Sequence, residues 1–214
     1  MNKIINERIK SFYYTDVNEI PEVNINPAKT ALLIMNMQNY QVGRIVDYAK
    51  EGVETGEGSQ WKDFYDRFEY ITLPAIQEIL DKCRRLGIKV TYGTVALKTD
   101  NPDHNVIISD IMPDDCDSIY ERHNKIGSSI TAGTSFVEDM RAQGIDTIIV
   151  TGVATDQCIS SSIRALSDEG FDLICVDEAC ATDCMEQQDY TLRSLNFTYC
   201  LVVSQLQIME LLDI

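Results

Sequence analysis

Short apolar runs alternate with segments of helical spacing along most of the chain. The runs are typical of strands buried in a parallel sheet, and they cover Thr30–Met35, Ile88–Gly93, Asp146–Thr151, Leu173–Val176 and Thr198–Val203. Apolar residues recur every three or four positions in Phe68–Leu86, and shorter helices are expected over 135–143, 159–169, 186–195 and 205–212. This alternation predicts an α/β fold, a doubly wound, mostly parallel sheet of about six strands with helices on both faces.

The segments outside this alternation are polar. Residues 1–28 are mixed in character and contain two prolines, so we expect an irregular arm there. Residues 50–63 are rich in glycine and charge and predict a loop, a candidate lid that includes Trp61, and residues 98–118 predict a long polar connection. The length of 214 residues fits one domain. We therefore expect a single domain over residues 1–214, with 1–28 as its N-terminal arm.

Charge and hydropathy exclude two classes of partner. Lysine and arginine number 18 against 34 aspartates and glutamates, which gives a net charge of −16. A chain this acidic repels phosphate backbones, so no nucleic-acid partner is expected. Apolar runs stay well below the roughly 18 residues of a membrane helix, and the first residues lack the apolar core of a signal peptide. We expect no membrane partner and a cytoplasmic protein.

Cysteine and histidine usage bears on metals and disulfides. The seven cysteines are odd in number in a chain of this size, which disfavours a disulfide framework. Cys180 and Cys184 are the closest pair, and neither His104 nor His123 lies near them in sequence. A structural zinc site needs four ligands at recognisable spacings. We therefore expect no metal and no other cofactor.

Cys158 is the candidate nucleophile. It lies between the predicted strand 146–151 and the predicted helix 159–169, at a strand-to-helix turn. Backbone N–H groups at a helix N-terminus favour a thiolate over a thiol and can hold an oxyanion. Position alone fits a small buried hydrophobe equally well. Because ligands bind at the carboxyl ends of parallel strands, Asn36 and residues 94–98 are expected at the same edge as Cys158.

Three sequence motifs resemble those of the isochorismatase-like cysteine hydrolases. The first is ALLIMNMQN, residues 31–39, and the second is KIGSSITAGT, residues 125–134. The third is GVATDQC, residues 152–158, followed by Asp-Glu-Ala at 177–179. The likeness covers roughly residues 28–205, and the third motif is the most specific. The resemblance implies the α/β fold of that superfamily, a homo-oligomer, and hydrolysis of a C–N bond in a small amide, ureido or carbamoyl compound.

The resemblance also assigns roles to particular residues. The catalytic Asp, Lys and Cys of the superfamily fall on Asn36, Lys125 and Cys158. In these enzymes the carboxylate takes the thiol proton and the lysine helps to hold the thiolate. The cysteine then forms an acyl-enzyme that water hydrolyses. A cis peptide between Val153 and Ala154, and an oxyanion hole from the backbone N–H groups of Ala154 and Cys158, are implied in the same way.

Position 36 departs from the pattern, because asparagine cannot accept a proton as a general base. Three explanations stay open: an engineered Asp→Asn change that leaves an inactive form, a naturally weakened or non-catalytic member, or another carboxylate such as Glu121 in its place. Taken singly, the motif residues also have plain interpretations. Asn36 fits a turn after a strand, Lys125 fits a solvated surface charge, and Thr155 and Asp156 fit helix N-caps.

Other activities are compatible with the same resemblance. Relatives that hydrolyse nicotinamide bind zinc through an aspartate and histidines after the second strand, and residues 94–100 of this chain contain no histidine. Nicotinamidase activity is therefore disfavoured. Vinyl-ether hydrolysis of the isochorismatase type does not need a cysteine, so Cys158 favours C–N hydrolysis. The alternatives are a vinyl-ether hydrolase and a non-catalytic small-molecule-binding protein. Substrate contacts are expected from residues 40–66 and 94–122.

Overall fold

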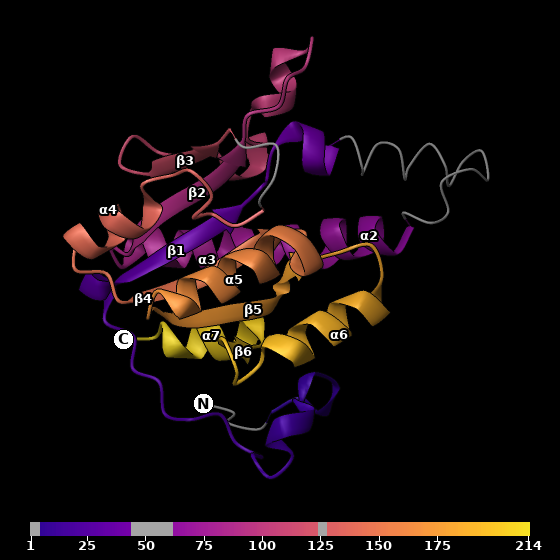
Figure 1. Ribbon diagram of the computed structural model, residues 1–214, viewed down its shortest axis with the longest axis vertical. Coiled ribbons are helices and arrows are strands. Elements are labelled where there is room, and N and C mark those ends of the chain that lie inside the picture. Colours follow the sequence, from indigo (N-terminus) through magenta and orange to yellow (C-terminus); the bar gives the residue numbers. More distant parts are fainter. Residues whose placement is uncertain (1–4, 44–61, 124–127) are drawn as a thin grey trace.

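The computed structural model describes residues 5–43, 62–123 and 128–214. Within these ranges six strands form one sheet in the order β3-β2-β1-β4-β5-β6 (Figure 1). Every neighbouring pair is parallel. The strands are β1 (Thr30–Met35), β2 (Lys89–Val95), β3 (Ser118–Arg122), β4 (Thr147–Val153), β5 (Asp172–Ala181) and β6 (Leu201–Val203). The predicted α/β fold with a parallel sheet is confirmed.

Helices and short helical turns connect the strands. The α-helices are α2 (Lys62–Arg67), α3 (Leu73–Arg85), α4 (Phe136–Ala142), α5 (Ser160–Asp168), α6 (Met185–Leu195) and α7 (Gln205–Leu211). The π turns are η4 (Asn39–Gly43), η6 (Phe68–Thr72) and η9 (Thr155–Ile159), and the 3₁₀ turns are η1 (Glu7–Ile9), η2 (Phe12–Tyr14), η3 (Pro27–Lys29), η7 (Pro102–Asn105) and η8 (Ser109–Ile111). The helix predicted over 68–86 therefore begins as a π turn and becomes α-helical at Leu73.

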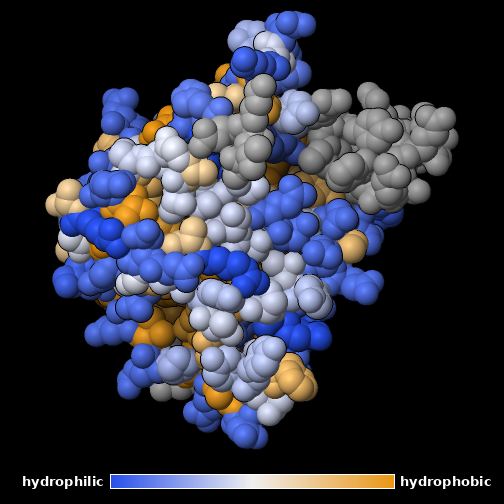
Figure 2. Space-filling model, in the orientation of Figure 1, coloured by the Kyte–Doolittle hydropathy of each residue, from blue (hydrophilic) through white to orange (hydrophobic). Residues whose placement is uncertain are grey.

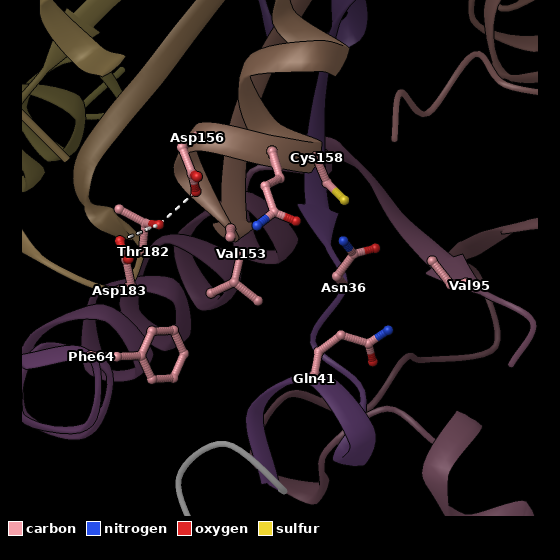
Figure 3. A pocket seen from close by; sticks show the side chains of 11 residues that line it. Asn36, Gln41, Phe64, Val95, Val153, Asp156, Cys158, Thr182 and Asp183 are labelled. Carbon is pink, nitrogen blue, oxygen red and sulfur yellow. Dashed lines mark hydrogen bonds between the residues drawn. The ribbon is translucent and has the colours of Figure 1, made fainter. Parts of the chain in front are cut away.

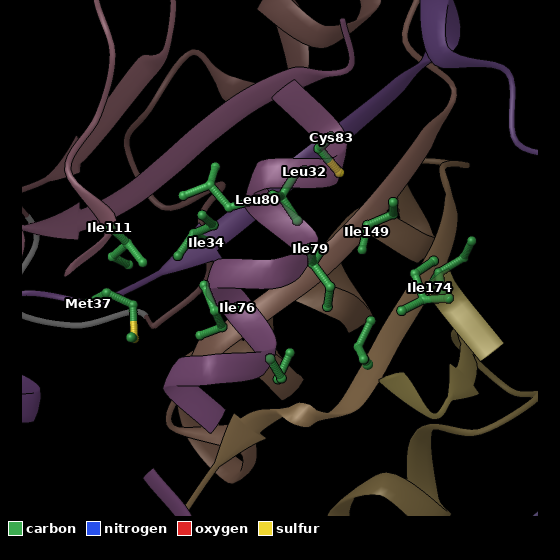
Figure 4. Close-up of a cluster of buried hydrophobic side chains, with 14 of the residues drawn as sticks. Leu32, Ile34, Met37, Ile76, Ile79, Leu80, Cys83, Ile111, Ile149 and Ile174 are labelled. Atoms are coloured by element: carbon green, nitrogen blue, oxygen red, sulfur yellow. The ribbon is translucent and has the colours of Figure 1, made fainter. Parts of the chain in front are cut away.

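The two faces of the sheet carry different helices. Leu32 and Ile34 of β1 pack with Ile76 and Ile79 of α3 on one face, where α7 also lies (Figure 4). Leu33, the residue between them, belongs to the cluster on the other face, which α4, α5 and α6 cover. Burial of one such side chain stabilises the fold by about 1.5–3 kcal/mol. Because β1 is buried on both faces, its sequence is a continuous apolar run rather than an alternating one.

Strand β3 was not predicted as a separate element, because it lies at the end of the polar segment 98–118. It is an edge strand, and its burial alternates: Tyr120 and Arg122 are buried whereas Ile119 and Glu121 are exposed. The other strand predictions were right in place, but three ended too early, and the last began too early because β6 starts only at Leu201. Strand β2 continues to Val95, β4 to Val153 and β5 to Ala181, so all three reach further toward the carboxyl edge of the sheet.

The N-terminal arm is more ordered than its sequence predicted. It contains the three short turns η1, η2 and η3, and it buries Ile5, Ile9, Ile20 and Ile25 against the domain. Arg8 forms ion pairs with Asp177 of β5 and Asp189 of α6. Apolar contacts and these ion pairs together hold the arm on the side of the sheet that carries β5 and α6. The predicted lid around Trp61 lies outside the described residues.

Strands β1 and β4 approach each other closely at their carboxyl ends. Met35 is the parallel partner of Gly152, which has a φ of 113°. A Cβ atom on Gly152 would lie 2.2 Å from the carbonyl oxygen of Met35, so no other residue fits without displacing backbone. This close approach brings Asn36 and the turn after β4 to the same point of the sheet edge.

The molecular surface agrees with the acidic composition. The face in Figure 2 is mainly hydrophilic, with small hydrophobic patches between the polar side chains. Large exposed apolar side chains include those of Tyr70, Tyr190 and Leu206. Throughout the described ranges, the helices are too short or too polar to cross a membrane.

Candidate active site

A pocket of about 330 Å³ lies at the carboxyl edge of the sheet. Its walls come from the ends of β2, β4 and β5 and from residues that follow β1, as expected for a ligand site in an open parallel sheet. The volume suits a small molecule. The lining residues are Asn36, Gln41, Phe64, Val95, Val153, Ala154, Asp156, Gln157, Cys158, Thr182 and Asp183 (Figure 3).

Cys158 lies in the π turn η9 between β4 and α5. The turn is entered through a cis peptide bond between Val153 and Ala154. Cys158 packs against the hydrophobic core on one side, but it stays partly exposed and lines the pocket. A purely structural role as a buried hydrophobe would not need this exposure.

The other cysteines are distinguished from Cys158 by burial or position. All seven are free thiols, and Cys83, Cys175, Cys180 and Cys200 are buried, whereas Cys116 is exposed and Cys184 partly exposed. Burial raises the pKa of the Cys83 thiol to about 12. The hydrogen bond with Cys175, together with burial, raises the pKa of the Cys180 thiol well above its ordinary value. Among the seven, Cys158 alone lines the pocket that faces the strand ends.

Asn36 is held in a constrained backbone conformation directly after β1. Its φ is 56°, in the left-handed region that asparagine adopts more readily than most residues, and its N–H donates to the Gly93 carbonyl at 2.8 Å. The side chain is only 3% exposed, and its Oδ1 accepts a hydrogen bond from Arg122 Nη2. Figure 3 shows the Cys158 sulfur and the Asn36 carboxamide pointing toward each other. The structure thus brings these two predicted site residues together.

Arg122 is the third member of this cluster, and the sequence analysis missed it. It is the last residue of β3, and its side chain is 2% exposed. Nη1 lies 3.7 Å from Cys158 Sγ and also donates to the Ser128 carbonyl. Nε donates to the Thr94 carbonyl at 3.3 Å. A sequence signal for Arg122 exists, because Tyr120 and Arg122 alternate onto one face of a strand. That signal can be used only if the strand itself is predicted first.

Two further sequence assignments have different outcomes. Lys125 lies outside the described residues, so its place in the site stays a prediction. Glu121 is exposed, lies on the opposite face of β3 from Arg122, and has its Oε1 3.3 Å from His123 Nε2. Glu121 is also absent from the described lining of the pocket. It is therefore not placed to replace the carboxylate that position 36 lacks.

Asp156 and Asp183 form an acidic wall of the pocket. Asp156 Oδ1 accepts a hydrogen bond from Thr182 Oγ1 at 2.5 Å (Figure 3). Asp183 Oδ1 accepts one from the Cys184 N–H at 2.9 Å. Neither Asp156 nor Thr155 acts as the N-cap of η9, because the cap residue is Ala154 and no side chain caps it. Thr155 Oγ1 is buried and has no hydrogen-bond partner among the described residues. The N-cap interpretation of these two residues is wrong.

The histidines lie away from the pocket lining. His104 Nδ1 is 2.8 Å from Thr99 Oγ1 and its ring contacts that of Tyr40, while His123 is exposed beside Glu121. In the part of the chain that the structure describes, three or more His, Cys, Asp or Glu side chains do not gather into a group that could hold a metal. The prediction that the reaction needs no metal still rests on the sequence, because residues 94–100 contain no histidine.

Comparison with known proteins gives matches at several levels. A family model described as Isochorismatase domain matches residues 30–207. The uncharacterized isochorismatase family protein YecD of Escherichia coli O157:H7 is 30% identical over 81 residues, which are 38% of this chain but only 42% of that protein. The cysteine hydrolase of Pseudomonas syringae pv. phaseolicola 1448A is similar in structure, with a TM-score of 0.69 and 19% identity over 90% of this chain and 96% of that one. N-carbamoylsarcosine amidase of Thermoplasma acidophilum has a TM-score of 0.60 and 21% identity over 83% and 96%.

Proposed function

Because the chain belongs to the isochorismatase family, we propose that it hydrolyses a C–N bond in a small amide, ureido or carbamoyl compound. The observation that carries this proposal is a partly exposed thiol, Cys158, that lines a pocket together with Asn36 and has the buried Arg122 beside it. The fold similarity to an enzyme named N-carbamoylsarcosine amidase supports the substrate class. A pocket of about 330 Å³ fits a substrate of that size.

In the proposed reaction the Cys158 thiolate attacks the carbonyl carbon of the substrate. The carbonyl oxygen becomes an oxyanion, which the backbone N–H groups of Ala154 and Cys158 stabilise. Collapse of this intermediate breaks the C–N bond, and the leaving nitrogen takes a proton from solvent water as it departs. Water then attacks the acyl-enzyme, which releases the acid and restores the thiol group. Lys125, the lysine of the sequence motif, remains a prediction for this site.

Asn36 limits this reaction at the step in which the leaving nitrogen is protonated. Its carboxamide can orient a neighbour but cannot pass a proton to the leaving nitrogen. We therefore propose that amide hydrolysis by this chain is slow, since the general-base position holds no carboxylate. This neutral residue also supports the alternative of a non-catalytic protein that binds a small molecule in the same pocket. Vinyl-ether hydrolysis is less well supported, because it gives no role to a thiol that lines the pocket.

A product assay separates these candidates. Small primary amides, ureido compounds and carbamoyl compounds are incubated with the protein, and released ammonia is measured beside the Cys158→Ala variant. Release that depends on Cys158 supports the amidohydrolase. Ligand-induced thermal stabilisation without release, in both the wild type and Asn36→Asp, supports the binding protein.

We expect no metal requirement for the hydrolysis. The proposed chemistry uses a thiolate as the nucleophile and backbone N–H groups for the oxyanion, so no step needs a Lewis acid. Prolonged treatment with EDTA, followed by gel filtration into metal-free buffer, should leave kcat/KM unchanged. Loss of activity that zinc restores would show that this expectation is wrong.

A homo-oligomeric state is proposed on the resemblance alone, and the cytoplasmic location stays a prediction from the sequence. The exposed side chains of Tyr70, Tyr190 and Leu206 offer apolar surface for contacts between copies. Multi-angle light scattering should give a mass that is a multiple of the 24.2 kDa chain. A particle with the mass of one chain at micromolar concentration would contradict the oligomer.

A further inference from the structure

Arg122 differs from Arg67, the other buried arginine among the described residues, and from the half-buried Arg84 in what it contacts. Arg67 pairs with Asp177 at 2.9 Å, and Arg84 pairs with Asp117 at 2.6 Å. Arg122 is 2% exposed, yet among the described residues it has no aspartate or glutamate as an ion-pair partner. A buried charge is costly unless a counter-charge lies beside it.

The atoms around the guanidinium identify the candidate counter-charge. Its hydrogen bonds go to the Thr94 and Ser128 carbonyls and to the Asn36 carboxamide, which are all neutral acceptors. Within the described part of the chain, the remaining contact is Cys158 Sγ, 3.7 Å from Nη1. Of these four acceptors, only the sulfur can carry a full negative charge, after its proton is lost to water.

We propose that Arg122 is the counter-charge of the Cys158 thiolate, so that the resting site is a guanidinium–thiolate pair with Asn36 as its neutral neighbour. This inference rests on the proposed nucleophilic role of Cys158. The guanidinium stays protonated throughout the pH range in which proteins are stable, and its rigid fork presents one nitrogen to the sulfur and another to Asn36.

The same pair gives Asn36 a role. A neutral carboxamide fixes the orientation of Arg122 through Nη2 and leaves its charge to the sulfur. A carboxylate at position 36 would accept the same hydrogen bond and would compete with the thiolate for that charge. Asn36 and Arg122 thus work as a unit, in which the arginine supplies a cation beside the sulfur.

The test measures thiol reactivity without any substrate. In a Cys116→Ala/Cys184→Ala background, Cys158 is the one thiol that is not buried. Alkylation by iodoacetamide is followed by mass spectrometry across pH. We expect Arg122→Gln to slow alkylation at neutral pH about tenfold and to move the midpoint of the pH–rate curve upward by about one unit, the effect of losing a nearby opposite charge. Arg122→Lys, which keeps the charge, should restore most of the rate.

The matched control is Arg141→Gln, which removes the same charge from an exposed arginine that pairs with Glu169. It should leave the pH–rate curve unchanged. If Arg122→Gln fails to fold, as judged by circular dichroism, the same pH–rate curve is measured for Asn36→Asp instead. Its added carboxylate should also raise the midpoint, because it takes up the charge of Arg122.

Two results would overturn the inference. One is a pH–rate curve in folded Arg122→Gln that matches the background protein. The other is an unchanged or lower midpoint in Asn36→Asp. Failure of the proposed function is a separate outcome. If no amide is hydrolysed but the pH–rate curve of alkylation changes in Arg122→Gln, the ion pair is supported and the hydrolase activity is not. If hydrolysis depends on Cys158 but the pH–rate curve of alkylation is the same with and without Arg122, the ion pair alone is refuted.

Discussion

The Cys158→Ala variant is expected to lose hydrolysis of every substrate that the wild type accepts and to keep its fold. The sulfur is the atom that forms the acyl bond, and removal of a catalytic nucleophile costs at least about 10³-fold in kcat/KM. The side chain is partly exposed, so its truncation leaves little unfilled volume. The free energy of unfolding should therefore change by less than about 1 kcal/mol.

The measurement is kcat/KM on the best substrate of the ammonia screen, with denaturant unfolding run in parallel. Cys116→Ala is the matched control, since it removes an exposed thiol that does not line the pocket. Activity of Cys158→Ala within tenfold of the wild type, with Cys116→Ala also normal, would remove Cys158 from the mechanism.

The Asn36→Asp variant is expected to hydrolyse amides faster than the wild type, by about 10²–10⁴-fold in kcat/KM. Asparagine and aspartate are nearly isosteric, so the change tests proton transfer rather than packing. An amine leaves poorly unless it is protonated, and the introduced carboxyl group can carry the thiol proton to the leaving nitrogen. Asn36 is 3% exposed and contacts Arg122, so the new group acts within the site.

An opposing effect makes this prediction more specific. The introduced carboxylate also competes for the charge of Arg122 and lowers the fraction of Cys158 present as thiolate. The gain should therefore appear only where the leaving group needs a proton. A p-nitrophenyl ester, whose leaving group departs as a stable anion, should react with Asn36→Asp no faster than with the wild type.

The control for added charge is Asn101→Asp, at an exposed residue that caps η7 through its side-chain oxygen, a role that a carboxylate can also fill. Its kcat/KM should match that of the wild type on both substrates. Equal amide kcat/KM for the wild type and Asn36→Asp would show that position 36 is not the base. Asp156, which lines the pocket two residues before Cys158, would then be the next carboxylate to test.

Much of the sheet could be predicted because its central strands are buried on both faces. Strand β1 has the predicted bounds, Thr30–Met35, since every residue in it is apolar or fully buried. Strand β3 escaped prediction because it is short, lies at the edge, and alternates exposed and buried residues within a polar stretch. Five residues of this kind carry too little periodicity to separate a strand from a loop.

The difference between buried central strands and the polar edge strand also explains which site residues could be predicted. Cys158 and Asn36 follow predicted strands, and the carboxyl ends of parallel strands share one edge, so their proximity could be foreseen. Arg122 could not, because a single arginine in a polar stretch has the sequence signature of a solvated charge. The pairing of β3 with β2, which sets Arg122 beside Val95, places its side chain next to Cys158 and Asn36.

The most direct test of Cys158 as the nucleophile is to trap its acyl-enzyme. The protein is mixed with p-nitrophenyl acetate, release of p-nitrophenol is followed, and the reaction is quenched in acid for peptide mass spectrometry. We predict a burst of one equivalent per chain, with one acetyl group on the peptide that contains Cys158, and neither in the Cys158→Ala variant. An equal burst in Cys158→Ala, or acetylation confined to other residues, would contradict the account.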